Sequence, residues 1–75
     1  MNKQRRNKIS EIVQSLKATA EQLENVKSEE EYCFDNMPEN LQYSMRGENS
    51  QEAIELLDEA LENLEEVIDS LEGVL

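Results

Sequence analysis

A chain of 75 residues allows one small domain, with a thin core that needs self-association or very regular helix packing. Its net charge of -11 argues against general binding to nucleic acid backbones, which need clustered Lys and Arg, and favours a basic or neutral partner. The chain has no histidine, which excludes His-based catalytic triads and His-containing metal sites.

The N-terminal segment MNKQRRNKIS is basic but lacks the apolar stretch of a secretory signal. No apolar run reaches transmembrane length. Cys33 is the single cysteine, so no intrachain disulfide can form and a reducing compartment is expected. We therefore expect a cytoplasmic protein with no membrane partner.

The first segment carries a stripe of apolar residues at helical spacing. With Ile9 at heptad position a, the stripe fills rows a, d and e, and Glu30 interrupts row a. The rows hold Ile9, Leu16 and Leu23 at a, Ile12, Thr19, Val26 and Cys33 at d, and Val13, Ala20 and Phe34 at e. This pattern predicts a helix over about residues 3–33, with Cys33 packed in its core and a seam that weakens toward the end.

The central stretch DNMPENLQYSMRG, residues 35–47, predicts a short helix over about residues 38–46 that lies across the end of a hairpin. Asp35 and Asn36 are good N-cap residues, and Pro38 suits a first helical turn. Gly47 is a natural stop.

The last segment has a heptad pattern without a miss, with acids in most other positions. Its rows hold Ile54, Leu61, Ile68 and Leu75 at a, Leu57, Leu64 and Leu71 at d, and Ala53, Ala60, Val67 and Val74 at g. Asn49 or Ser50 is expected to cap this helix, with Glu52 placed as in a capping box. The pattern predicts a helix over about residues 50–73.

Charge is unevenly divided between the two long segments and favours an antiparallel arrangement. Residues 1–27 carry six bases and three acids, for +3, whereas residues 48–75 carry ten acids and no base, for -10. An antiparallel hairpin places Arg5 and Arg6 beside Asp69 and Glu72, which offsets the unfavourable helix dipoles.

The fold class is therefore all-α: one domain, residues 1–75, formed by an antiparallel, coiled-coil-like helical hairpin with a short central helix. Apolar stripes three residues wide exceed what a two-stranded seam needs, which predicts self-association into a four-helix or larger bundle. A monomeric hairpin closed by the central segment is the alternative. The predicted oligomer core consists of Ile9, Ile12, Leu16, Leu23, Val26, Ile54, Leu57, Leu61, Leu64, Ile68 and Leu71.

No nucleophile–base pair, glycine-rich phosphate loop or metal-ligand spacing occurs, so we expect neither an enzyme nor a cofactor or metal site. The central segment is richer than a connector requires, since aromatic rings, amides and one arginine can stack on and hydrogen-bond a planar or phosphorylated ligand. The candidate ligand-binding residues are Tyr32, Asp35, Asn36, Asn40, Gln42, Tyr43, Ser44 and Arg46. The alternative is that these groups only cap the open end of the bundle.

The layout of a basic start, a first helix, FDNMPENLQYSMRGE and an acid-leucine helix resembles small uncharacterised helical-hairpin proteins encoded by phages and prophages. The resemblance covers nearly the whole chain, and its most specific part is the middle. The matching residues there are Asp35, Asn36, Pro38, Glu39, Leu41, Gln42, Ser44, Arg46 and Gly47. The resemblance implies a context, a phage accessory or anti-defence protein in the host cytoplasm, more than a mechanism.

Together, the residues and the resemblance predict a non-enzymatic protein that sequesters a small nucleotide-like signal molecule at the central segment. One alternative is an acidic inhibitor that mimics a nucleic acid and blocks a basic surface on a host protein; another is a purely structural oligomerisation module. The expected partners are a second copy of the chain and either the ligand or a basic host protein, without direct nucleic acid binding.

Overall fold

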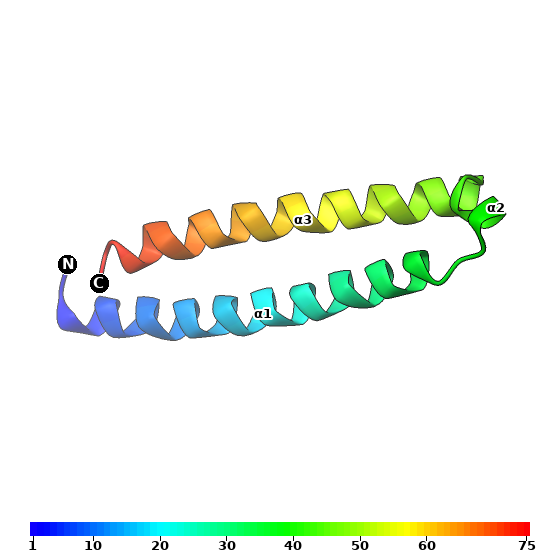
Figure 1. The fold of residues 1–75 in the computed structure, drawn as a ribbon. Helices are drawn as coiled ribbons and strands as arrows, with labels where there is room; N and C mark the ends of the chain where they lie inside the picture. The colour runs from blue at the N-terminus through cyan, green and yellow to red at the C-terminus, as the bar shows by residue number, and fades with distance from the viewer.

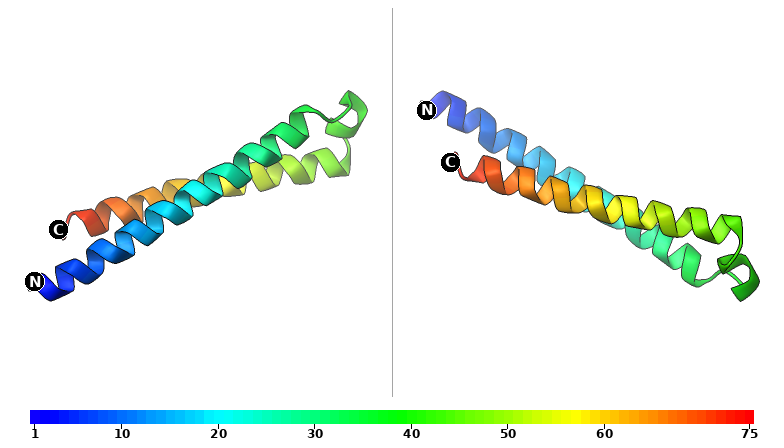
Figure 2. Two further views of the ribbon diagram at one scale, coloured as in Figure 1. Left: turned by 90° about the horizontal axis from the view of Figure 1, so that it is seen from below. Right: turned by 90° about the horizontal axis from the view of Figure 1, so that it is seen from above.

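The computed structural model describes residues 1–75 as three helices: α1 (Lys3–Asp35), α2 (Glu39–Gln42) and α3 (Met45–Glu72). The two long helices lie side by side and antiparallel, with both termini at one end and α2 at the other (Figure 1). Figure 2 shows that they cross at a shallow angle. The resulting rod measures 58 × 14 × 12 Å. The predicted all-α helical hairpin is confirmed.

α1 is stabilised at both ends by asparagine side chains. At its start the Arg5 backbone N–H donates to Asn2 Oδ1 at 2.8 Å. At its end the Tyr32 carbonyl oxygen accepts both the backbone N–H of Asn36, at 3.1 Å, and its side-chain Nδ2, at 2.7 Å. The helix continues through Asp35, two residues past its predicted end. Neither long helix contains an apolar stretch of the length that crossing a membrane requires.

The boundaries around the connector differ from the prediction. α2 is a single turn, and α3 begins at Met45 with Ser44 as its N-cap, not near residue 50. Asn36 ends α1 and does not cap α2, while Asn49 and Ser50 lie inside α3. The expected capping box is therefore absent, because α3 starts about one and a half turns before the predicted start near residue 50.

Gly47 explains the early start. It lies in the first turn of α3 with a negative φ, so it is not the left-handed stop that the sequence predicts. A Cβ at this position would lie 2.1 Å from the Gln42 carbonyl oxygen and 2.6 Å from that of Leu41. The absence of a side chain thus lets the backbone of α2 rest directly on α3.

The seam of the hairpin uses rows a and d of α3 but rows a and e of α1. Val13, from row e, is the most buried side chain at 2% exposed, and it accompanies the buried Leu61 and Ile68. Row d of α1 is left outside, with Ile12 51% and Val26 49% exposed. This rotation packs the large Phe34 of row e against the hairpin and brings Lys27 of the same row to α3.

Cys33 belongs to this outer row and is exposed. The prediction that it packs in the core is therefore wrong for the single hairpin. The predicted core residues Ile12 and Val26 likewise take no part in the intrachain seam, whereas Val13 was omitted from that core.

Polar contacts cross the seam where apolar packing weakens. Lys27 Nζ lies 2.7 Å from Asp58 Oδ1, and Ser50 Oγ donates to Glu30 Oε1 at 2.6 Å. Ser50 is 5% exposed, so the hydroxyl of a buried side chain satisfies the carboxylate that interrupts row a. Both contacts join α1 to α3 in the observed register and favour that alignment of the helices.

The charge argument for an antiparallel hairpin identified the orientation but the wrong partners. Glu72 pairs with Lys17 at 3.1 Å, and Asp69 makes no ion pair. Arg6 donates to the Met1 carbonyl oxygen at 2.7 Å, at the far end of α1. Lys17 is the base whose position along α1 lets its long side chain reach Glu72. Arg5 and Arg6 lie nearer the N-terminus, in the first turns of α1, and make no ion pair with α3.

Candidate functional site

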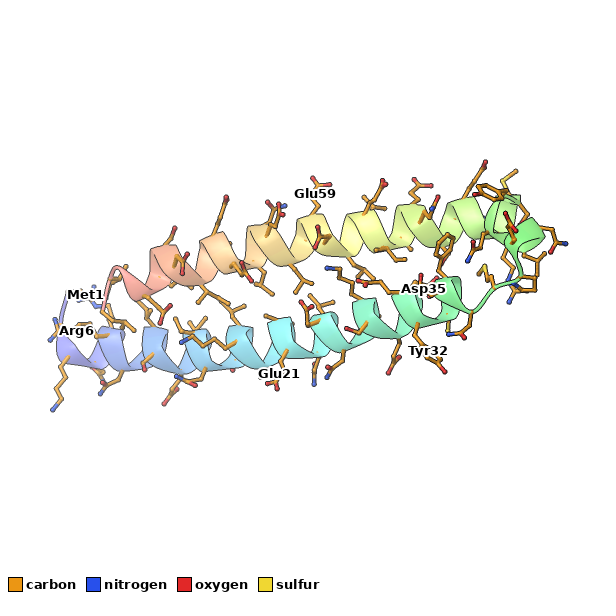
Figure 3. All side chains as sticks on the ribbon, viewed as in Figure 1. Met1, Arg6, Glu21, Tyr32, Asp35 and Glu59 are labelled. Carbon is orange, nitrogen blue, oxygen red and sulfur yellow. The ribbon has the colours of Figure 1, made fainter.

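A hollow of about 410 Å³ lies at the connector end of the rod. The end of α1, the connector, α2 and the start of α3 each contribute to its wall. The lining residues are Tyr32, Cys33, Asn36, Met37, Pro38, Leu41 and Arg46. Figure 3 labels Tyr32 and Asp35 at this end, with Met1 and Arg6 at the other.

Three of the predicted ligand-binding residues line this hollow: Tyr32, Asn36 and Arg46. Tyr32 and Asn36 lie one turn apart at the end of α1, whereas Arg46 comes from the start of α3, so the folded connector brings Arg46 to the other two. The sequence interpretation missed the apolar part of the wall. The four-residue spacing of Met37 and Leu41, which predicts one face of a short helix, was the available signal for it.

Other predicted site residues stabilise the connector instead. Gln42 Nε2 donates to the Phe34 carbonyl oxygen at 3.0 Å and joins α2 to the end of α1. The Ser44 hydroxyl donates to the Leu41 carbonyl oxygen between α2 and α3. For Gln42 and Ser44 the structure therefore supports the capping role.

Asp35, Asn40 and Tyr43 are exposed and lie outside the wall of the hollow. Asn36 both lines the hollow and caps α1 through its amide nitrogen, so its side-chain oxygen is the group free to accept a bond. The predicted set thus divides into hollow-lining, connector-stabilising and peripheral residues.

The hollow combines three kinds of chemistry. Arg46 makes no ion pair, so its guanidinium is available for bidentate binding of a phosphate or carboxylate. The exposed Tyr32 ring offers a stacking surface, and Met37 and Leu41 supply an apolar wall that is half-buried. A planar group with an attached anion matches this set.

The long sides of the rod present a different surface. Of the 18 acids, only Glu31, Asp58 and Glu72 make ion pairs, which leaves fifteen without one. Figure 3 shows Glu21 and Glu59 projecting from opposite outer edges of the hairpin. No three carboxylate or thiol groups lie close enough together to hold a metal ion.

Lys27 is the one group whose pKa is clearly shifted. The hydrogen bond to Asp58 raises the pKa of Lys27 above its ordinary value, and the nearby Glu24 and Glu31 act in the same direction. Desolvation of the ammonium opposes the shift. Lys27 is thus held charged by its partners and serves the seam, and it does not line the hollow.

Comparisons with protein-family models, with curated proteins and with solved structures returned no match to this chain.

Proposed function

We propose that this protein is a non-catalytic binding protein that captures a small, phosphorylated, nucleotide-like ligand in the connector hollow. The observation that carries the proposal is the convergence of Arg46 and Tyr32 on one hollow of about 410 Å³. A volume of that size falls within the range of small-molecule sites.

Each lining group has a role in this proposal. The Arg46 guanidinium holds a phosphate by two parallel hydrogen bonds, and the Tyr32 ring stacks on the base. The Asn36 side-chain oxygen accepts a bond from a base amino group, while Met37 and Leu41 exclude water from one face of the ligand. In the phage setting that the resemblance implies, such a protein acts by withdrawing a signal molecule from the host.

The test is a thermal-shift measurement with a panel of cyclic nucleotides and nucleotide sugars. A ligand that binds only the native state raises the melting temperature, by an amount that corresponds to about 2.7 kcal/mol when its concentration is 100 times Kd. Arg46→Ala should abolish the rise while the far-UV circular dichroism stays unchanged. Arg6→Ala, which removes an arginine at the opposite end of the rod, is the matched control and should retain the rise. If no member of the panel shifts the melting temperature, the ligand proposal fails.

A second function is favoured by the fifteen acids that lack an ion pair. In this proposal the carboxylates of α3 occupy a basic surface on another protein, as a nucleic acid backbone would. Such binding should weaken steeply with salt and should be lost on charge reversal at Glu62 and Glu66. Salt-independent capture of the partner would count against it.

We also infer that hairpins associate into a bundle. Several large apolar side chains, including Ile12, Val26 and Leu56, are about half exposed or more in the single chain. Only five of the 75 residues are buried in the single rod, so a partner that covers the exposed apolar side chains adds stability. Sedimentation at micromolar concentration tests this inference, and a mass of 8.7 kDa throughout would refute it.

A further inference from the structure

The acids of α3 avoid two of the five heptad rows that face away from the seam, rows c and g. All ten acids of residues 48–75 occupy rows b, e and f. The outward row c holds Asn49, Leu56, Asn63 and Ser70, and row g holds only alanine and valine over the same range. Leu56 is 58% and Val67 47% exposed, so these rows form an uncharged surface on a helix that is otherwise strongly acidic.

α1 carries a matching surface. Arg5, Lys8 and Glu29 bound the outer rows d and g of α1 at their two ends. Between them row d holds Ile12, Thr19 and Val26, and row g holds Ser15 and Gln22. All five side chains are exposed and none is charged. Charged residues are 33% of this chain, and depletion of charge is what marks the core of an interface.

The two uncharged surfaces lie on the same side of the hairpin. Ile12 directly precedes the seam residue Val13, and Val67 directly precedes the seam residue Ile68. Each outer row is therefore rotated from its seam by one residue, about 100°, in the same sense when each helix is viewed from its own N-terminus. Because the helices run in opposite directions, these equal rotations bring both rows to one broad face of the rod.

We infer that this uncharged face binds a second copy of the chain, and that the two hairpins align with their connectors at the same end. The inference rests on the pairing of hairpins proposed above but not on the identity of any ligand. On this face the uncharged stretches run over residues 12–26 of α1 and 49–74 of α3, which at 1.5 Å per residue are about 21 and 38 Å of the 58 Å rod. With its charged ends included, the flat area of this side, 58 Å by 14 Å, is comparable to the roughly 800 Å² that each partner contributes to an interface of standard size.

Charge decides the orientation. A two-fold axis across the rod would lay α3 against the partner's α3, and residues 48–75 carry -10 in each copy. The axes of the two α3 helices would then lie about 8–10 Å apart, so two like-charged helices would be direct neighbours even though their acids point away from the interface. A two-fold axis along the rod instead lays α3 against the partner's α1. The bases Lys3, Arg5 and Lys8 of α1, which have no ion pair within the chain, then lie beside the acidic end of that α3.

The same-end orientation has a consequence for the hollow. Cys33 continues the outer row d of α1 and Arg46 continues row g of α3, and both line the hollow. The hollow therefore lies at the end of the uncharged face, where the partner covers it. The two hollows face each other across the axis, so that the partner's guanidinium joins the wall of each.

The orientation is tested with the single native cysteine. A nitroxide spin label on Cys33 reports the distance between the two copies by double electron–electron resonance. Because Cys33 lies at the end of the covered face, the same-end dimer brings the two labels close together, within roughly 25 Å, about two helix diameters. The opposite orientation separates them by most of the 58 Å length of the rod. Asn40→Cys in a Cys33→Ser background repeats the measurement from an exposed site on α2, away from the interface.

The face itself is tested by Ile12→Glu, with Gln14→Glu as the matched control. Both changes add one carboxylate to an exposed position of α1, but only Ile12 lies on the uncharged face. Ile12→Glu should raise the dimer dissociation constant at least about tenfold, while Gln14→Glu should leave it within about twofold. Equal effects of both variants would show that the face is not the interface.

Each outcome has a distinct meaning. A mass of two chains with short label distances supports the inference, whereas long distances overturn the same-end orientation and leave the pairing of hairpins intact. A mass of one chain overturns both. The thermal-shift experiment with nucleotides is decided separately from all three results.

Discussion

Gly47 shows how one missing side chain shapes the connector. In most helices a glycine is replaced by alanine with a gain of about 0.5–1 kcal/mol, because alanine loses less backbone entropy on folding. Here the added methyl group would meet the backbone carbonyls of Leu41 and Gln42, which cannot rotate away as the end of a side chain can. At this position the replacement of glycine by alanine should therefore destabilise the protein.

We predict that Gly47→Ala lowers the melting temperature, with a loss of about 1–3 kcal/mol in the free energy of unfolding as α2 is pushed off α3. Urea denaturation followed by circular dichroism measures this loss. Gly73→Ala is the control, since its Cβ would have its nearest contact at 3.2 Å in the terminal turn. That variant should change stability by no more than about 0.5 kcal/mol. A stabilised Gly47→Ala protein would contradict the close packing of α2 on α3.

Ser50 gives a second prediction at this scale. Ser50→Ala leaves the Glu30 carboxylate without its donor inside the seam and should cost about 1.5–3 kcal/mol. Adding Glu30→Leu to Ser50→Ala should recover that loss, because an apolar pair fills the same space without a charge to satisfy. Urea denaturation of the wild type, both single variants and the double variant measures the coupling. If the stability changes of the two single variants simply add in the double variant, the Ser50–Glu30 hydrogen bond does not stabilise this part of the seam.

At the scale of the element, the rotation of α1 is the main determinant of the hairpin. Rows a, d and e of α1 all carry apolar residues, and the structure uses a and e. Lys27 lies in row e and would face away from Asp58 if row d formed the seam. The polar contact therefore helps to choose between two apolar rows of similar character.

The pKa of Lys27 leads to a prediction about alkaline pH. Because the pKa is raised in the folded state, the contribution of Lys27 is fully present below the ordinary lysine pKa and is lost as pH rises through the folded value. The difference in unfolding free energy, wild type minus Lys27→Met, should be constant from pH 7 to roughly pH 10. Above that pH the difference should decrease, because the wild type loses the stabilisation from charged Lys27. Urea denaturation across this range measures it. Lys27→Arg keeps the charge at high pH, so its stability relative to Lys27→Met should not decrease. If the stability of the wild type relative to Lys27→Met is the same at pH 11.5 as at pH 7, the raised pKa is contradicted.

At the scale of the whole molecule, charge opposes folding. The net charge of -11 lies on a rod only 58 Å long, and three ion pairs offset little of it. Ion pairs at such exposed positions contribute at most about 1 kcal/mol each. Repulsion along α3 should therefore exceed the attraction across the seam.

We expect the melting temperature to rise as sodium chloride is increased from low to moderate concentration, since salt screens the repulsion more than it weakens the few attractions. Thermal melts at constant protein concentration measure this effect. The double variant Glu62→Gln and Glu66→Gln removes two exposed charges and should show a smaller rise. A melting temperature that falls with salt would mean that the ion pairs outweigh the repulsion.

The connector shows where prediction from the sequence stops. Its length, its composition and the expectation of a short helix were visible, as was the group of polar residues around it. Which of them line the hollow was not, because Gln42 and Ser44 bind backbone carbonyls that only the folded turn brings near. The hollow also depends on Cys33, which the heptad pattern assigned to the core.

The sequence by itself determined two long helices, their antiparallel pairing and the acidic character of one of them. These features follow from the spacing of apolar residues and the division of charge, both of which are local or additive along the chain. The tertiary structure alone decided which rows of α1 form the seam, where α3 begins and which side chains meet at the connector. Each of these depends on contacts between residues far apart in the chain, such as Lys27 with Asp58 or Gly47 under α2, which no periodicity within one helix can specify.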